Sequence, residues 1–222
     1  QKHTAEGSVN CIQLRGEYLF SSEGSGGFNV YDVASIANKG FSQKTITAPF
    51  SPLGQDTRVE SKNATCMALP TNQPIHPPRN EGDLMRVENE EQPFHPIYNY
   101  ALVTDSEEGL ILVDVNTLAD GLPRNNFLKR SLTWNENNIL NGARHITIAG
   151  YIVYITTPDS VVVLDLNDPL SPKLVNRIKM NDPRATALQF RYLFVTDKEG
   201  LKIFDATSPQ NIKSSPVASI AI

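Results

Sequence analysis

A strand–turn–strand unit recurs along the chain and limits its possible folds more than any other feature. The clearest copy runs from Tyr192 to Asp205, where Leu193 and Val195 alternate with Phe194 and Thr196. That alternation has the period of a β-strand. A polar turn ending at Gly200, where a positive φ costs least, separates this strand from a second one. Similar segments occupy residues 18–32, 100–114 and 152–165.

The spacing of these units indicates a repeat architecture. Their terminal aspartates stand at positions 32, 114, 165 and 205, and the last two are 40 residues apart. A period near 40 residues with strand-like alternation is typical of propeller blades, whereas helical repeats of that length alternate every 3.6 residues. The sequence therefore predicts an all-β fold, a β-propeller with four recognisable four-stranded blades.

Each unit divides into four expected strands. In chain order, we expect them at residues 9–14, 18–22, 28–33 and 44–48, then 64–69, 98–104, 110–115 and 127–132, then 145–149, 152–156, 161–166 and 174–179, and finally 186–190, 192–196, 201–204 and 217–222.

Three segments carry a family likeness. They are Leu112-Val-Asp114, Val163-Leu-Asp165 and Ile203-Phe-Asp205, and the last two are followed by connectors containing Asn-Asp-Pro or Ser-Pro. This pattern resembles the LVIVD repeat, and the likeness covers residues 9–222 apart from one insertion. The resemblance implies propeller blades in an exported, extracellular or periplasmic, bacterial or archaeal protein. It implies no catalytic residues, because the family has no common catalytic set.

The number of blades bears on the size of the ring. Propellers have from about four to eight blades, so four repeats form either a small disc or part of a larger propeller. The chain ends in the apolar stretch Val217–Ile222. We therefore expect residues 1–222 to be a single propeller domain or a propeller fragment, with further blades supplied by a longer polypeptide.

One region interrupts the repeat. Residues 70–97 form a long inserted loop within the second blade, rich in proline and glutamate. Insertions of this length are usually functional or disordered. We expect the loop to contact a protein partner; a solvated loop without a specific role is the alternative.

Composition argues against several classes of function. The net charge is −4 and Lys and Arg form no dense run, which argues against nucleic-acid binding. No apolar stretch approaches the roughly 20 residues of a transmembrane segment. Nucleophile motifs and phosphate-binding glycine loops ahead of a helix are also missing from the sequence. The chain is therefore more consistent with a binding module than with an enzyme.

The histidines are the candidate metal ligands. His76 and His95 lie in the insertion, and each is followed by proline. Such a pair could bind a metal ion or offer an axial ligand to a haem that a partner supplies; surface loop histidines are the commoner alternative. His145 takes the place of Cys11 and Ala185 on its innermost strand, so we expect it to be packed or to line the channel.

The cysteines and aspartates have mainly structural interpretations. Cys11 and Cys66 lie on the first strands of adjacent units, and a disulfide requires Cα atoms within about 7 Å. Since inner strands rarely converge that closely, we favour buried free thiols. We expect the four terminal aspartates to cap turns, and not to form a ring of acids. Asp105 and Asp197 are expected in solvated turns.

Together these patterns predict a non-catalytic β-propeller scaffold of an exported protein, in a surface or redox-associated assembly. The alternative is a metal- or haem-associated redox or enzyme domain with ligands from the insertion or the axial channel. A third interpretation is a purely structural spacer.

Overall fold

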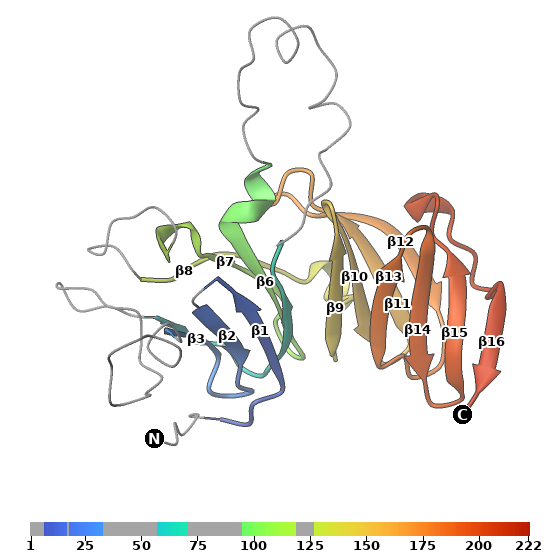
Figure 1. Cartoon of the computed structure of the whole chain (residues 1–222), viewed down its shortest axis with the longest axis horizontal. Helices are drawn as coiled ribbons and strands as arrows, with labels where there is room; N and C mark the ends of the chain where they lie inside the picture. The colour runs from blue at the N-terminus through green and yellow to red at the C-terminus, as the bar shows by residue number, and fades with distance from the viewer. Residues whose placement is uncertain (1–6, 17, 33–56, 71–94, 119–126) are drawn as a thin grey trace, which may run out of the picture.

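The computed structural model describes residues 7–16, 18–32, 57–70, 95–118 and 127–222, and for Asp32 the backbone alone. Four antiparallel four-stranded sheets are arranged as a four-bladed β-propeller, which confirms the predicted fold (Figure 1). Each sheet is a meander in which consecutive strands pair.

The strands fall into four blades. Blade 1 holds β1 (Cys11–Arg15), β2 (Tyr18–Ser22), β3 (Phe28–Asp32) and β4 (Arg58–Val59), and blade 2 holds β5 (Ala64–Ala68), β6 (Tyr100–Asp105), β7 (Gly109–Asp114) and β8 (Lys129–Trp134). Blade 3 holds β9 (His145–Ala149), β10 (Ile152–Thr157), β11 (Ser160–Asp165) and β12 (Lys173–Lys179), and blade 4 holds β13 (Ala185–Gln189), β14 (Tyr192–Asp197), β15 (Gly200–Asp205) and β16 (Ala218–Ala221).

Short 3₁₀ helices occupy some of the connections. They are η1 (Pro96–Asn99), η2 (Asn116–Leu118), η4 (Glu136–Asn138) and η5 (Pro209–Asn211). Within the described ranges, no helix is both long and apolar enough to cross a membrane.

In blade 1, the described outer strand is β4, a two-residue strand paired with Phe28 and Asn29. The strand expected at residues 44–48 stays a prediction. Residues 44–48 lie outside the described residues. In blade 2, β5 ends at Ala68 and β6 begins at Tyr100. Most of the insertion, with His76, lies outside the described residues.

Alternate side chains of each central strand face opposite neighbouring blades. In blade 2, Ala101 and Val103 belong to a hydrophobic cluster shared with blade 1, whereas Leu102 belongs to a cluster shared with blade 3. We call the side of a blade that faces the previous blade along the chain its preceding face. The side that faces the next blade is its following face. The apolar core of the propeller is thus divided among the interfaces between successive blades.

The innermost strands contact one another in chain order. β1 contacts β5, β5 contacts β9, and β9 contacts β13. Among the described residues, no comparable contact joins β13 to β1, and no hydrophobic cluster joins blade 4 to blade 1. In Figure 1 these two blades stand at opposite sides of the molecule. The four blades therefore form an open arc.

A disulfide joins the first two innermost strands. Cys11 on β1 is bonded to Cys66 on β5, with 4.8 Å between their Cα atoms. The interpretation of both cysteines as free thiols is therefore wrong. The reason is positional: Cys11 is paired with Ser22, Cys66 with Thr104, and these partners occupy equivalent places in their blades. Equivalent positions on adjacent inner strands meet near the axis of the arc.

Candidate functional site

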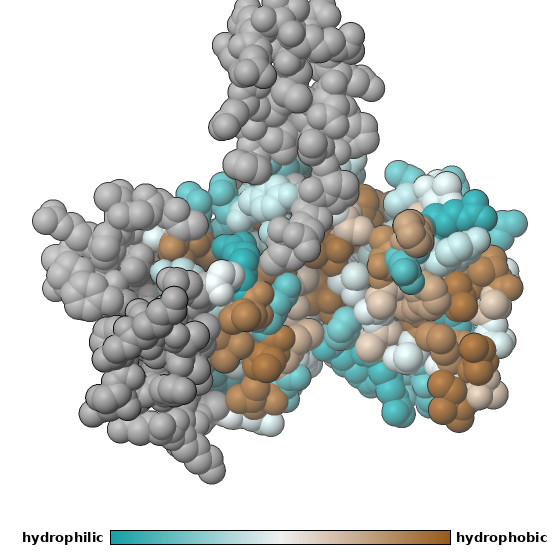
Figure 2. Space-filling model, viewed as in Figure 1, coloured by the Kyte–Doolittle hydropathy of each residue, from teal (hydrophilic) through white to brown (hydrophobic). Residues whose placement is uncertain are grey.

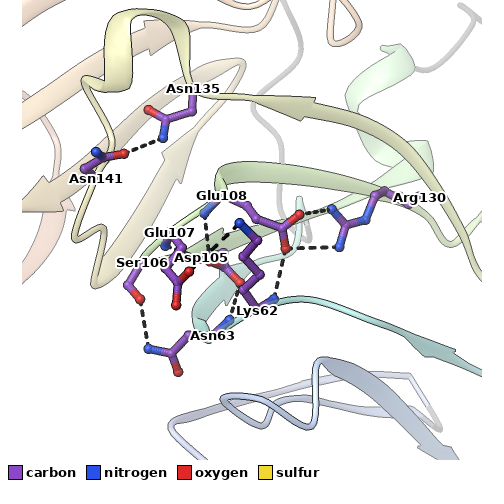
Figure 3. A network of polar contacts seen from close by, with 9 residues as sticks. All are labelled: Lys62, Asn63, Asp105, Ser106, Glu107, Glu108, Arg130, Asn135 and Asn141. Carbon is purple, nitrogen blue, oxygen red and sulfur yellow. Dashed lines mark hydrogen bonds and ion pairs between the residues drawn. The ribbon is translucent and has the colours of Figure 1, made fainter.

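The turn between β6 and β7 organises a polar network at one end of blade 2 (Figure 3). Asp105 is fully buried there. Its Oδ1 accepts hydrogen bonds from the backbone N–H groups of Glu107, at 2.8 Å, and Glu108, at 2.9 Å. Its Oδ2 accepts another from the N–H of Asn63 at 2.6 Å. The expected solvated turn is wrong for this carboxylate, because the segment before β5 covers it.

The corresponding turn of blade 4 uses the same chemistry. Asp197 Oδ1 accepts from the N–H groups of Glu199 and Gly200, and Lys202 Nζ lies 2.6 Å from Oδ2. Burial raises the pKa of Asp197, but the bonds from Lys202 and the turn backbone outweigh burial and lower the pKa below its usual value. Asp197 is buried, so the solvated interpretation is wrong here as well.

The terminal aspartates cap turns, as expected. Asp114, Asp165 and Asp205 each accept a hydrogen bond from the backbone N–H two residues later, at 2.9, 2.7 and 3.0 Å respectively. These bonds close local turns after the third strands of blades 2, 3 and 4. The side chain of Asp32 lies outside the described residues.

A charged cleft adjoins the network of blade 2. It has a volume of about 620 Å³ and lies between the outer strands β4 and β8. Arg130 Nη1 donates to Glu108 Oε1 at 2.7 Å and Arg130 Nη2 donates to the carbonyl of Glu60. The hydrogen bond from Arg130 lowers the pKa of Glu108. The residues lining the cleft are Arg58, Val59, Glu60, Ser61, Lys62, Glu108, Leu128 and Arg130.

The cleft combines fixed and loosely held charges. The side chains of Arg130 and Glu108 are 28% and 19% exposed, and their bonds fix both groups. By contrast, Lys62 Nζ lies 4.0 Å from Glu107 Oε2, and both side chains are more than half exposed. An exposed ion pair at that distance contributes little to the stability of the protein. Lys62 can therefore exchange Glu107 for another carboxylate. The sequence did not predict this cleft. The alternating charged residues at positions 58, 60 and 62, ahead of β5, are the feature of the sequence that could have indicated it.

His95 lies where the insertion rejoins blade 2 and is buried, so it is not a surface loop histidine. Its Nδ1 accepts from the N–H of Ile97 at 3.2 Å and thereby caps η1. The Nε2 atom lies 3.3 Å from Asn167 Oδ1, and the ring stacks on Tyr151 at 5.5 Å. Both ring nitrogens therefore face polar partners within the protein. Its predicted role as a metal or haem ligand stays a prediction.

His145 packs between the innermost strands of blades 3 and 4, as expected. Its Nδ1 accepts from the backbone N–H of Thr186 at 3.3 Å. Burial lowers the pKa of His145, which favours the neutral ring at neutral pH. Thr147 Oγ1 donates to the carbonyl of the same Thr186 at 2.8 Å, so polar bonds join the two strands beside the axis.

The described part of the chain contains no group of three or more His, Cys, Asp or Glu side chains placed to hold a metal ion. Any metal site that used His95 or His145 would need ligands from elsewhere.

Comparison with known proteins supports the fold. No protein-family profile and no curated protein matches the chain. Among solved structures, the computationally designed protein Ika4 is similar, with a TM-score of 0.56, 9% identity and coverage of 92% of this chain and 95% of that one. A functionally unknown protein from Desulfotomaculum acetoxidans has a TM-score of 0.57 and 15% identity, covering 96% of this chain and 56% of that one. The designed protein Ika8 has a TM-score of 0.53 and 9% identity, covering 96% and 48%.

These similarities show the fold alone. The chain spans about half the length of two of these proteins, at 48% and 56%. The fold and the comparisons define a β-propeller arc of four blades. The LVIVD resemblance stays a prediction.

Proposed function

We propose that the chain is a non-catalytic β-propeller interaction module of an exported protein, and that it binds a protein partner through the charged cleft between β4 and β8. The observation that carries the proposal is the arrangement of charges in that cleft. Arg130 and Glu108 fix each other, whereas Lys62 projects from the segment before β5 with an exposed, weakly held side chain.

The cleft suits a protein segment better than a compact ligand. Arginine, lysine and glutamate side chains alternate around it, so a bound segment would need carboxylates and cations in matching places. The open, shallow form between two outer strands leaves room for a loop or an extended peptide. Association through such complementary charges is expected to weaken as salt is added.

The disulfide supports the exported location. Structural disulfides persist in oxidising compartments and are rare in the cytosol. The Cys11–Cys66 bond lies between two innermost strands, where it joins blades 1 and 2. An extracellular or periplasmic protein, as the LVIVD resemblance implies, would retain this bond.

Capture from the exported fraction of the source organism tests the binding role. Chemical cross-linking with the wild-type chain should identify a partner, whose affinity is then measured by calorimetry. We expect Lys62→Glu to weaken that affinity by about tenfold, since it replaces attraction with repulsion. Lys173→Glu is the matched control, because this lysine is exposed on blade 3. Equal affinity for wild type and Lys62→Glu would contradict the proposed site.

A metal- or haem-associated domain is the second candidate. The observation that favours it is His145, whose lowered pKa keeps the ligand-competent neutral ring beside the axis. Further ligands would come from His95, from His76 in the insertion, or from a partner. Metal analysis and an absorption spectrum of the purified chain test this role. A stoichiometric metal, or a haem band lost in His76→Ala or His95→Ala, would replace the non-catalytic interpretation.

A further inference from the structure

The following face of blade 4 is an apolar surface that no blade covers among the residues that the structure describes. In blade 3, Tyr154, Val161 and Val163 form the following face and are buried against blade 4, each at most 2% exposed. The equivalent residues of blade 4, by strand register, are Phe194, Leu201 and Ile203, all partly exposed.

The outer strands give the sharpest comparison. Ile178 on β12 pairs with Val161 and is fully buried, whereas Ile220 on β16 pairs with Leu201 and is 58% exposed. Figure 2 shows this apolar surface in brown over β15 and β16. The following face of blade 4, made of Phe194, Leu201, Ile203 and Ile220, thus keeps the apolar residues of an inner blade but lacks a neighbour.

The preceding face of blade 1 is the complementary surface. Ile12 and Leu14 on β1 are 61% and 60% exposed. Met67 on β5 takes the place of Ile12, and Leu69, the residue after β5, takes the place of Leu14. Met67 and Leu69 are only 3% and 2% exposed because blade 1 covers them. Leu19 lies beside Leu14 and is partly exposed. Hydrophobic surface is also visible over β1 in Figure 2.

We propose that the following face of blade 4 docks on the preceding face of blade 1 of a second copy of this chain. The contact would continue an interface that the chain already makes three times, between blades 1 and 2, 2 and 3, and 3 and 4. Each of those interfaces pairs a following face with a preceding face. At the two ends of the arc, blade 4 offers an unpaired following face and blade 1 offers an unpaired preceding face.

A second copy of the chain can cover the following face of blade 4 and the preceding face of blade 1 at the same time. Two arcs joined head to tail at both ends form a closed ring of about eight blades, which is within the known range of propellers. This docking is independent of the charged cleft, so either proposal can fail without the other.

Two charge substitutions test the docking in the full chain. Light scattering during gel filtration should give twice the mass of one chain for the wild type. Ile203→Glu alters the blade 4 face and Leu14→Glu the blade 1 face, and each should raise the dimer dissociation constant about tenfold or more, since each buries a carboxylate in an apolar contact. Leu170→Glu is the matched control, at an exposed leucine of a blade 3 connector.

An equimolar mixture of the two variants gives a signature of head-to-tail docking. The unaltered blade 1 face of Ile203→Glu can pair with the unaltered blade 4 face of Leu14→Glu, so the mixture should regain dimers that neither variant forms alone. Circular dichroism should show both variants folded, because the altered side chains are exposed or partly exposed within one chain.

Two results would overturn the proposal. A monomeric wild type would mean that the end faces stay open, close on each other, or are covered by further blades of a longer polypeptide. A dimer that responds to Ile203→Glu but not to Leu14→Glu would mean that two blade 4 faces meet each other.

Discussion

At the scale of single residues, polar side chains hold the turns of this molecule by binding backbone groups. Asp105 shows the strongest case, because one buried carboxylate accepts three backbone N–H groups. Removing such an acceptor would leave buried donors unpaired, which is costlier than losing an exposed hydrogen bond. Asp197 accepts two backbone N–H groups at the equivalent place of blade 4, so the recurrence of this aspartate reflects a repeated folding requirement.

His145 should make the stability of the protein depend on pH. Its folded pKa is lowered by burial, so the unfolded chain binds the proton first as the pH falls. The neutral ring of His145 makes its full contribution to the free energy of unfolding above about pH 6.5, the ordinary pKa of histidine. That contribution decreases as the pH falls below this value, and it stops changing below the folded pKa. One proton can change the free energy of unfolding by at most about 1.4 kcal/mol per pH unit.

The variant His145→Asn isolates this effect, because its amide oxygen can still accept from Thr186. We expect the wild type to lose more stability than the variant between pH 8 and pH 5.5, measured by urea unfolding. Identical losses in both proteins would show that His145 does not titrate as the structure implies.

Some of these residue roles could be predicted from sequence and others could not. The turn-capping role of Asp114, Asp165 and Asp205 depends on residues only two positions away, so local sequence suffices. The burial of Asp105 depends on Asn63, which is 42 positions away, and no local pattern reports it. The same holds for His95, whose Nε2 faces Asn167 across 72 positions.

At the scale of an element, the β14–β15 turn depends on one glycine. Gly200 has a φ of +139°, and a Cβ added there would lie 2.1 Å from the carbonyl oxygen of Ile220. Both the backbone conformation and the neighbouring strand β16 therefore exclude a side chain.

We expect Gly200→Ala to lower the free energy of unfolding by about 2 kcal/mol or more, since strain and a backbone clash add together. Gly150→Ala is the matched control: its φ is +63°, and nothing lies within 4 Å of the added Cβ. It should cost only about 1 kcal/mol. Urea unfolding of both variants measures the difference, and equal losses would contradict the predicted clash.

The strands themselves were predictable to different degrees. The second strands of blades 2, 3 and 4 are six residues long and rich in apolar residues, and in β14 buried and less buried residues alternate with a period of two. By contrast, β4 has only two residues and no period, and it pairs after a long connection. A strand as short as β4 carries too little pattern for the sequence alone to identify it.

At the scale of the whole molecule, the disulfide ties the first blade to the second. Its two cysteines are 55 positions apart, so the bond restricts a long segment of the unfolded chain. The sequence could not assign it, because pairing depends on the register of two separate sheets.

We expect the double variant Cys11→Ala/Cys66→Ala to lose about 2–4 kcal/mol of unfolding free energy. Urea unfolding with and without a reducing agent checks this: reduction should weaken the wild type by a similar amount and leave the variant unchanged. Two reactive thiols in the non-reduced, denatured wild type would refute the bond itself.

The open arc is also a property of the whole molecule that the repeats do not specify. The alternation of each blade predicts that both of its faces are apolar, but only the exposure of Ile12 and Ile220 shows which faces lack a neighbour.

The Cys11–Cys66 bond has a mechanical consequence. When tension is applied to a point before Cys11, it passes through the sulfur atoms to Cys66 and bypasses the 54 residues between them. Blade 1, which lies almost wholly within that span, would carry no load. Stretching the chain from its N-terminal end would therefore lengthen it through blades 2 to 4 first, and only a reductant would allow blade 1 to be drawn out.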